Sequence, residues 1–331
     1  MWDREITVHT SAETEAAVSP ETQAVTPPGE DNLYLIFTMD CLPARPRGAV
    51  SGPESWDTAT GCMLEFASAL SSRDLKATFF VVPEAGRQLQ DPVEQVKERG
   101  MEAGLLCHPP IAGYRRWLGA YPYDPQREIV RLARKVWQQK LGMDVESFRP
   151  GCFSSNDYTF QIVLMEGFHQ GSCSLPGRMS EEHSCSWGEA DPLPRHTDPL
   201  DKNLRGTMEF YEVPVTSDFE CAPDDDEADA EFTPAHLSLD DESVVDRAPA
   251  LAQKHLARMD EEAPAVRTLT FYARNFPDYV DGETEYGRLL DRLMEGLRPV
   301  AEEYELEIQS GTVADAHRVA DQASGSAGPA N

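Results

Sequence analysis

Basic residues, paired cysteines and long apolar runs are all scarce in this sequence, and each scarcity excludes a class of protein. Of 331 residues, 29 are lysine or arginine and 58 are aspartate or glutamate, so the formal net charge is −29. We therefore expect no nucleic-acid partner, because phosphate binding relies on a basic surface. The seven cysteines include no Cys-x-x-Cys pair, which predicts a reducing compartment and no disulfide framework.

Targeting segments and nucleotide-binding loops are not apparent either. The sequence starts Met-Trp-Asp-Arg-Glu-Ile, without the basic start and apolar core of a signal peptide, and no apolar run approaches the length of a membrane span. These features predict a soluble, cytoplasmic protein without a membrane partner. No Gly-x-Gly-x-x-Gly or Walker-type loop follows the first predicted strand, which disfavours nucleotide binding.

Predicted strands and helices alternate from residue 33 to about residue 170. The strands are short apolar, β-branched or aromatic runs, and the helices carry apolar residues along one stripe. We expect strands at 33–37, 76–82, 101–106, 145–148, 168–174, 207–216, 266–273 and 305–308, and helices at 55–70, 91–100, 124–142, 156–166, 248–258 and 284–299. This alternation implies parallel strands covered by helices, and hence an α/β protein with a doubly wound sheet or a barrel.

Both ends of the chain and one internal segment fall outside the predicted barrel. Residues 1–31 are rich in Glu, Thr, Ala and Pro and predict a disordered arm, whereas 310–331 is rich in Ala, Gly and Ser and predicts a flexible tail. The barrel domain is expected to span 32–309. Within it, the acidic run in 217–263 predicts a solvated insertion, and 175–206 is a loop long enough to be functional.

Several predicted strands end on polar or ionisable side chains. Asp40 and Cys41 end the first strand, while His108, Arg149 and Arg274 follow three later ones. Because the carboxyl ends of barrel strands carry the chemistry, we expect these five residues to surround one cavity. For Asp40 alone, the simpler interpretation is that it caps a turn, since aspartate is common where strands end.

The same segments resemble the motifs of the polysaccharide deacetylase family. Thr38-Met39-Asp40-Cys41 is similar to the family's first motif, Thr-Phe-Asp-Asp, and the run from Gly100 to Pro109 is similar to the second. Phe148-Arg149-Pro150 resembles the third motif, and Lys76 to Val81 resembles the strand after the first. The resemblance covers roughly residues 33–309 and implies a distorted (β/α)7 barrel.

The resemblance also implies a chemistry. The family removes the acetyl group from N-acetylated sugars with a divalent metal held by one Asp and two His, so it implies a hydrolase of non-peptide carbon–nitrogen bonds with a small-molecule or oligosaccharide ligand. It assigns Asp40 as the catalytic base, Arg149 as the charge that keeps Asp40 ionised, and His108 as a metal ligand. Arg274 lies near the position of the family's late catalytic histidine, where it could stabilise a developing oxyanion.

Two positions of the family's metal site differ in this chain. Cys41 replaces the metal-binding aspartate, and Leu106 replaces one of the two histidines. A zinc site could still form from thiolates and imidazole, because Cys41, Cys107, His108 and Cys152 would all approach the mouth. The simpler interpretation is that these cysteines pack in the core.

The long loop and the aromatic residues supply further candidates. His183 or His196 could fold over the mouth as a ligand or an acid, and otherwise both are exposed loop histidines. Phe153 and Trp187 could stack on a sugar ring, although aromatic residues also fill barrel cores. Because metal ligands and the late histidine are missing, a catalytically inactive homologue that binds carbohydrate stays as the alternative function.

Overall fold

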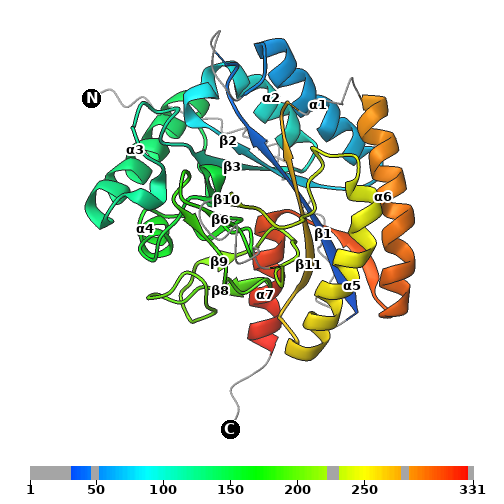
Figure 1. Cartoon of the computed structure of the whole chain (residues 1–331). Coiled ribbons are helices and arrows are strands. Elements are labelled where there is room, and N and C mark those ends of the chain that lie inside the picture. Colours follow the sequence, from blue (N-terminus) through cyan, green and yellow to red (C-terminus); the bar gives the residue numbers. More distant parts are fainter. Residues whose placement is uncertain (1–30, 46–51, 222–230, 277–282, 327–331) are drawn as a thin grey trace, which may run out of the picture.

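Strands and helices alternate around one curled sheet (Figure 1). The computed structural model describes residues 31–45, 52–221, 231–276 and 283–326, and within them nine strands form this sheet. Its strands are β1 (Asn32–Cys41), β2 (Ala77–Val81), β3 (Glu102–Cys107), β4 (Ser147–Pro150), β5 (Gln170–Gly171), β8 (Arg195–His196), β9 (Tyr211–Glu212), β11 (Arg267–Arg274) and β12 (Glu307–Ser310). The helices are α1 (Trp56–Ser71), α2 (Gly86–Glu98), α3 (Tyr123–Leu141), α4 (Thr159–Met165), α5 (Val244–Glu262), α6 (Glu283–Glu303) and α7 (Val313–Ser326). A small second sheet joins β10 (Glu231–Phe232), β6 (Met179–Ser180) and β7 (Cys185–Ser186).

The sheet curls into a distorted barrel. Its order is β11-β1-β2-β3-β4-β5-β9-β8, with β12 paired to the first half of β1, and its neighbours are parallel except for β8 and β9. The chain after β9 lies between the two flanks of the curl, because the Val213 N–H donates to the Gly171 carbonyl at 2.8 Å and the Thr216 N–H donates to the Thr270 carbonyl at 3.1 Å. The predicted fold class, a distorted α/β barrel, is confirmed.

Alternate residues of each barrel strand face two different cores, because successive side chains of a strand point to opposite faces. The odd-numbered residues of β1, Cys41 among them, pack in the large cluster formed with α1, α2, α3, α5 and α6, which we call the outer core. Tyr34 and Ile36 pack in a smaller cluster inside the barrel, together with residues of α7, which we call the inner core. Asp40 shares the inner parity. The strand therefore turns Asp40 towards the barrel interior and Cys41 towards the helices.

Local signals fix the ends of the covering helices. The Ser55 hydroxyl accepts the Thr58 backbone N–H at 3.0 Å and so caps the first turn of α1. Gly142 ends α3 with φ at +67°, a left-handed conformation that glycine adopts without strain. Across 31–45, 52–221, 231–276 and 283–326, none of the helices is both long and apolar enough to cross a membrane.

The prediction of a flexible C-terminal tail is corrected by a helix near the end of the chain. Val313–Ser326 forms α7, whose Val313, Val319 and Ala320 are buried in the inner core (Figure 1). Alanine is the best helix former, so the composition that suggested disorder also suits a helix once an apolar face is buried. The expectation for 310–331 is thus wrong over α7, and residues 327–331 lie outside the described residues.

Other expected boundaries also change. The supposed insertion 217–263 contains α5, a full covering helix, while its acidic run at 222–230 and the N-terminal arm at 1–30 lie outside the described residues. Helix α2 begins at Gly86 and passes through Pro92, and α6 continues through Pro299. In both helices, packing of a buried face outweighs the one backbone hydrogen bond that a proline removes.

Candidate functional site

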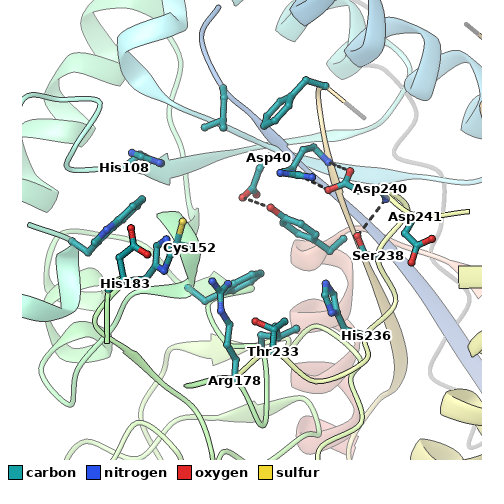
Figure 2. A pocket seen from close by; sticks show the side chains of 18 of the residues that line it. Asp40, His108, Cys152, Arg178, His183, Thr233, His236, Ser238, Asp240 and Asp241 are labelled. Carbon is teal, nitrogen blue, oxygen red and sulfur yellow. Dashed lines mark hydrogen bonds and ion pairs between the residues drawn. The ribbon is translucent and has the colours of Figure 1, made fainter. Parts of the chain in front are cut away.

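A cavity of about 640 Å³ opens at the carboxyl end of the barrel strands (Figure 2). Of the residues expected there, Asp40, His108 and Arg274 line it, and Arg149 lies buried against Asp40. The remaining walls combine charges of both signs, two further histidines and aromatic rings, so the cavity suits a polar ligand. Among its charged residues are Arg178, Glu182, Asp240, Asp241 and Arg247.

Arg149 is fully buried, and its guanidinium is held on several sides. It donates to Asp40 Oδ1 at 2.9 Å, to Thr38 Oγ1 at 3.0 Å, and to both the carbonyl and the hydroxyl oxygen of Ser172 at 2.7 Å. The guanidinium carbon also lies 4.3 Å from the centre of the Phe80 ring. Because a charge with this many partners cannot turn away, Arg149 fixes the orientation of Asp40.

Asp40 keeps one oxygen towards the cavity. Its Oδ1 is bound by Arg149, whereas its Oδ2 accepts a long hydrogen bond of 3.4 Å from the Tyr272 hydroxyl (Figure 2). Burial raises the pKa of Asp40 above its ordinary value, and the Arg149 guanidinium limits that rise. Burial also raises the pKa of Tyr272 well above its ordinary value, so the phenol stays protonated and donates. A carboxyl group shifted towards neutral pH suits proton transfer.

Two histidines flank Trp117 on one wall. The Trp117 ring centre lies 4.7 Å from that of His108 and 5.0 Å from that of His183. His108 Nδ1 accepts the Ile111 backbone N–H at 3.4 Å, so its proton lies on Nε2. Burial lowers the pKa of His108 to about 4, which leaves the ring neutral at pH 7. Of the two loop histidines considered from the sequence, His183 is thus the one that reaches the mouth.

Sequence reasoning misses several cavity residues, and three of them come from one extended run. Residues 236–240 read His-Leu-Ser-Leu-Asp; both leucines pack in the outer core, while the histidine, serine and aspartate line the cavity. Backbone hydrogen bonds of 2.8 and 2.7 Å to Tyr272 hold the run beside β11. The alternation of apolar and polar residues is the sequence signal that could have placed this run. The run follows the acidic segment closely along the chain.

His236 brings an imidazole close to β11. Its Nδ1 lies 3.0 Å from the Pro234 carbonyl and must donate there, so Nε2 keeps its lone pair. Burial lowers the pKa of His236 to about 4. Next to it, Asp240 accepts the Arg274 backbone N–H at 2.8 Å and also pairs with the Arg274 guanidinium. Arg274 is therefore held at the rim by a carboxylate.

Three predicted site residues do not reach this cavity. Cys41 has no exposed surface and packs in the outer core, because its parity in β1 is opposite to that of Asp40. Trp187 is also fully buried, and its Nε1 donates to the Phe153 carbonyl at 2.8 Å. His196 ends β8 and faces α7 instead. The expectation of ligand or metal contacts at the mouth is corrected for all three.

Phe153 does line the cavity, and the turn that carries it is strained. Cys152 and Phe153 have φ angles of +53° and +58°, in the left-handed region that side chains avoid. Such residues cost about 1–3 kcal/mol each and cluster at functional sites, where the surrounding structure holds them. The hydrogen bond from Trp187 to the Phe153 carbonyl is one such support.

The metal set of the deacetylase family does not fit these residues. Cys41 and Cys107 pack in the outer core, and Leu106 packs in the inner one. Cys152 lines the cavity, but burial raises the pKa of its thiol to about 12. In the part of the chain that the structure describes, no group of three close ligand atoms includes Asp40 or His108. The groups of three that do occur are His196, His317 and Asp321, and Glu182, His183 and Glu231.

No protein-family model matches the sequence, and no curated protein matches it. Solved structures do match. A Mycobacterium smegmatis protein assigned as a polysaccharide deacetylase has a TM-score of 0.55 and 15% identity, with 91% of this chain and 93% of that chain covered. A Parabacteroides distasonis protein assigned as a glycoside hydrolase or deacetylase has a TM-score of 0.58 and 10% identity, over 88% of this chain and 71% of that chain.

The PuuE allantoinase has a TM-score of 0.52 and 14% identity, over 92% of this chain and 94% of that chain. The fold is that of the polysaccharide deacetylase barrel. At identities this low, the similarity shows the fold alone. What this chain does has to be argued from its own cavity.

Proposed function

We propose that this chain hydrolyses a non-peptide carbon–nitrogen bond of a small polar ligand, such as the N-acyl group of a sugar-like compound, in the cavity. The observation that carries the proposal is the buried pair of Asp40 and Arg149, with Asp40 Oδ2 turned to the cavity (Figure 2). The fold supports it, because matching structures are named as a deacetylase and as an allantoinase.

Asp40 acts as the general base. Its Oδ2 takes a proton from a water molecule, whose oxygen attacks the acyl carbon to give a tetrahedral intermediate. When the carbon–nitrogen bond breaks, Asp40 returns the proton to the departing nitrogen, so the products are a carboxylic acid and an amine. Burial supports both steps, because an acid and base group works best when its pKa lies close to the working pH.

The other walls position the ligand. The neutral ring of His108 offers its Nε2–H to the acyl oxygen, and His236 offers an Nε2 lone pair to a hydroxyl or amide group of the ligand. Arg274 binds at the rim, where Asp240 holds it. Phe153 and Trp117 supply apolar faces, as sugar rings require.

The test is turnover of N-acetylated sugars and oligosaccharides, followed as released acetate. Replacing Asp40→Asn keeps the size of the side chain but removes the base, so we expect kcat/KM to fall by about 10²–10⁴-fold. Asp144→Asn is the matched control, because Asp144 is exposed and lies outside the cavity lining. Circular dichroism verifies that both variants are folded. Full activity of a folded Asp40→Asn variant would contradict the mechanism.

The residues at the family's metal-ligand positions also predict how turnover responds to a chelator. Since Cys41 and Leu106 face the two cores, a zinc ion bound as in the family has no set of ligands here. We therefore expect a chelator to leave turnover unchanged. Loss of activity with EDTA in protein that circular dichroism shows to stay folded, restored by zinc, would show that the cavity rearranges to bind metal.

A second candidate is a carbohydrate-binding protein without catalysis. The absence of two of the family's metal ligands from the cavity favours it, because the family's reaction depends on a metal that Cys41 and Leu106 are not placed to bind. Under this alternative, N-acetylated oligosaccharides bind in the cavity with no acetate release, and Asp40→Asn changes affinity alone. Isothermal titration beside the turnover assay separates the two functions.

A further inference from the structure

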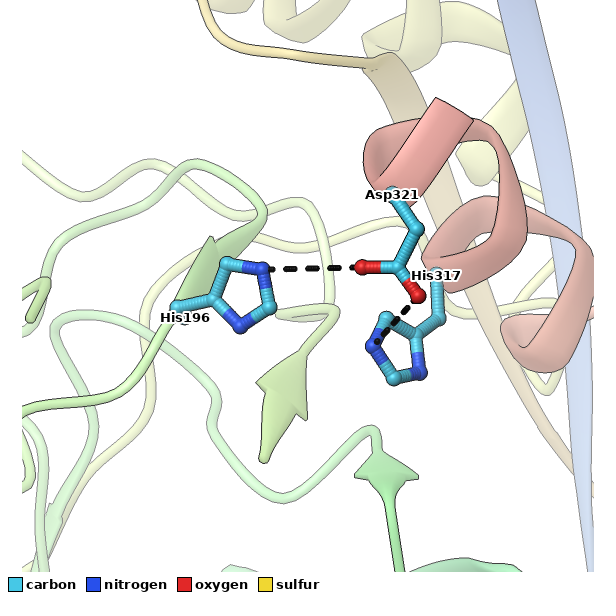
Figure 3. Close-up of side chains that lie close together, drawn as sticks. All are labelled: His196, His317 and Asp321. Atoms are coloured by element: carbon cyan, nitrogen blue, oxygen red, sulfur yellow. Dashed lines mark ion pairs between the residues drawn. The ribbon is translucent and has the colours of Figure 1, made fainter. Parts of the chain in front are cut away.

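A second group of ionisable side chains lies at the amino end of the barrel strands, where β5 and β9 begin. Figure 3 shows the group from close by. His196 ends β8, and His317 and Asp321 are one helical turn apart on α7. The residues next to them, Gln170 and Tyr211, begin β5 and β9. The cavity with Asp40 lies at the carboxyl ends of the strands, so this cluster is separate from it.

The two imidazoles point at one carboxylate. His196 Nε2 lies 3.9 Å from Asp321 Oδ1, and His317 Nε2 lies 3.6 Å from Asp321 Oδ2 (Figure 3). All three ligand atoms lie within 4.8 Å of one another. Two ligands of one tetrahedral zinc ion, each at 2.0–2.1 Å from it, are about 3.4 Å apart. The two histidine–carboxylate separations exceed this value by about half an ångström or less, and the two Nε2 atoms, at most 4.8 Å apart, would have to approach each other to share one ion.

Neighbouring groups fix which nitrogen of each ring is free. His196 Nδ1 lies 3.0 Å from the Met208 carbonyl oxygen and must donate to it. His317 Nδ1 lies 3.0 Å from Gln170 Oε1, and Gln170 donates its own amide to the Ser147 hydroxyl at 2.9 Å. Both Nε2 atoms thus keep their lone pairs. This second layer of contacts is what orients histidine ligands in metalloproteins.

Packing holds the rings, while the mouth of the cluster stays open. The buried Tyr211 ring stacks on His317 at 5.1 Å, with 5° between the planes, and meets the His196 ring edge-on at 5.1 Å. The Asp321 side chain is 60% exposed, His196 34% and His317 15%. An ion could enter from solvent and would keep positions for water.

We propose that His196, His317 and Asp321 form a binding site for a divalent transition-metal ion of the zinc type. Two imidazoles and one carboxylate are a typical set for such an ion, with the remaining positions open to water. The ion would tie α7 to β8 and stabilise the fold around the inner core.

The experiment uses the full chain without a histidine tag, carrying Cys221→Ser to remove an exposed thiol. Zinc is titrated by calorimetry at pH 7, and cobalt is titrated by its visible absorption. We expect one equivalent of each ion to bind. Saturating zinc should raise the melting temperature by about 5 °C, because binding to the folded state alone stabilises it.

Two ligand variants and one control decide the result. Asp321→Asn and His317→Gln should each weaken zinc binding by at least about tenfold and remove the rise in melting temperature. Because Asp321 is exposed, its variant tests the site even where the His317 variant folds poorly. His183→Gln, in the other candidate group, should bind zinc normally. The proposal is overturned if the parent binds no zinc, or if only His183→Gln loses it.

Discussion

The buried pair of Asp40 and Arg149 makes the sharpest prediction about stability. Replacing Arg149→Met leaves the Asp40 carboxyl without its cation and the polar atoms of Ser172 without their donor. The two side chains are 0% and 8% exposed, and breaking a buried pair by removing one partner costs about 3–5 kcal/mol. The corresponding fall in melting temperature is about 10 °C. Arg131→Met, whose ion pair is exposed, should cost under about 1 kcal/mol.

The pH dependence identifies the cause of that loss. The pKa of Asp40 is raised in the folded protein, so folding favours its protonated form, and stability falls as pH rises from about 4 through the folded pKa. Without Arg149, which limits this rise, the folded pKa moves higher and the fall continues further. Urea unfolding should therefore show a larger deficit for Arg149→Met at pH 8 than at pH 5. Adding Asp40→Asn should reduce the deficit at pH 8. An equal deficit at both pH values would refute the electrostatic explanation.

Three further predictions follow from packing. Gly151→Ala places a Cβ 2.8 Å from His108 Cδ2 and should displace that ring, so the affinity for a ligand in the cavity should fall. Gly61→Ala is the control, because a Cβ there meets open space beside α1, and it should keep both affinity and stability. Cys41→Asp restores the family's residue but puts a carboxylate in the outer core, so it should lower the melting temperature without adding bound metal. A gained zinc equivalent by elemental analysis would contradict the placement of this side chain in the outer core. Val319→Asp should lower the free energy of unfolding in urea by several kcal/mol, on the order of the cost of a buried unpaired charge, while Gln322→Asp on the exposed face of α7 should not. Equal stability of the two variants would mean that α7 does not complete the inner core.

The strands could be predicted from the sequence, but the direction of their side chains could not. The run from Leu33 to Phe37 is apolar at every position because both faces of β1 are buried, so no alternation marks the inner face. The prediction that Asp40 and Cys41 serve one site fails for this reason. The α7 helix was hidden differently, since its Val313, Val319 and Ala320 are spaced for one face but lie among alanines and serines that also suit a tail.

The rest of the site depends on contacts that no local pattern encodes. His236 reaches the cavity only because residues 236–240 add to the edge of β11, and His183 reaches it only because its loop packs against Trp117. The alternation in 236–240 is only five residues long and the His183 loop shows none, so contacts with distant segments decide where both lie. Sequence reasoning finds the carboxyl ends of regular strands and misses what irregular segments bring to them.

Polar side chains with several hydrogen bonds lie at both ends of the inner face of the barrel. Near the amino end, Glu102 accepts hydrogen bonds from Thr78 at 2.7 Å, from Ser147, and from the Ala314 N–H that begins α7 at 3.1 Å. Such groups are tolerated inside a protein only when each has a partner, so the barrel helps to fix the start of α7. The helix also carries a local start signal, because the Thr312 N–H donates to Asp315 Oδ2 at 3.0 Å and the Asp315 N–H donates to Thr312 Oγ1 at 3.1 Å. At the carboxyl end, Arg149 is the hydrogen-bond donor that Asp40 requires as a buried polar group. The same inner parity of the strands thus supplies both the anchor of the last helix and the base of the proposed site.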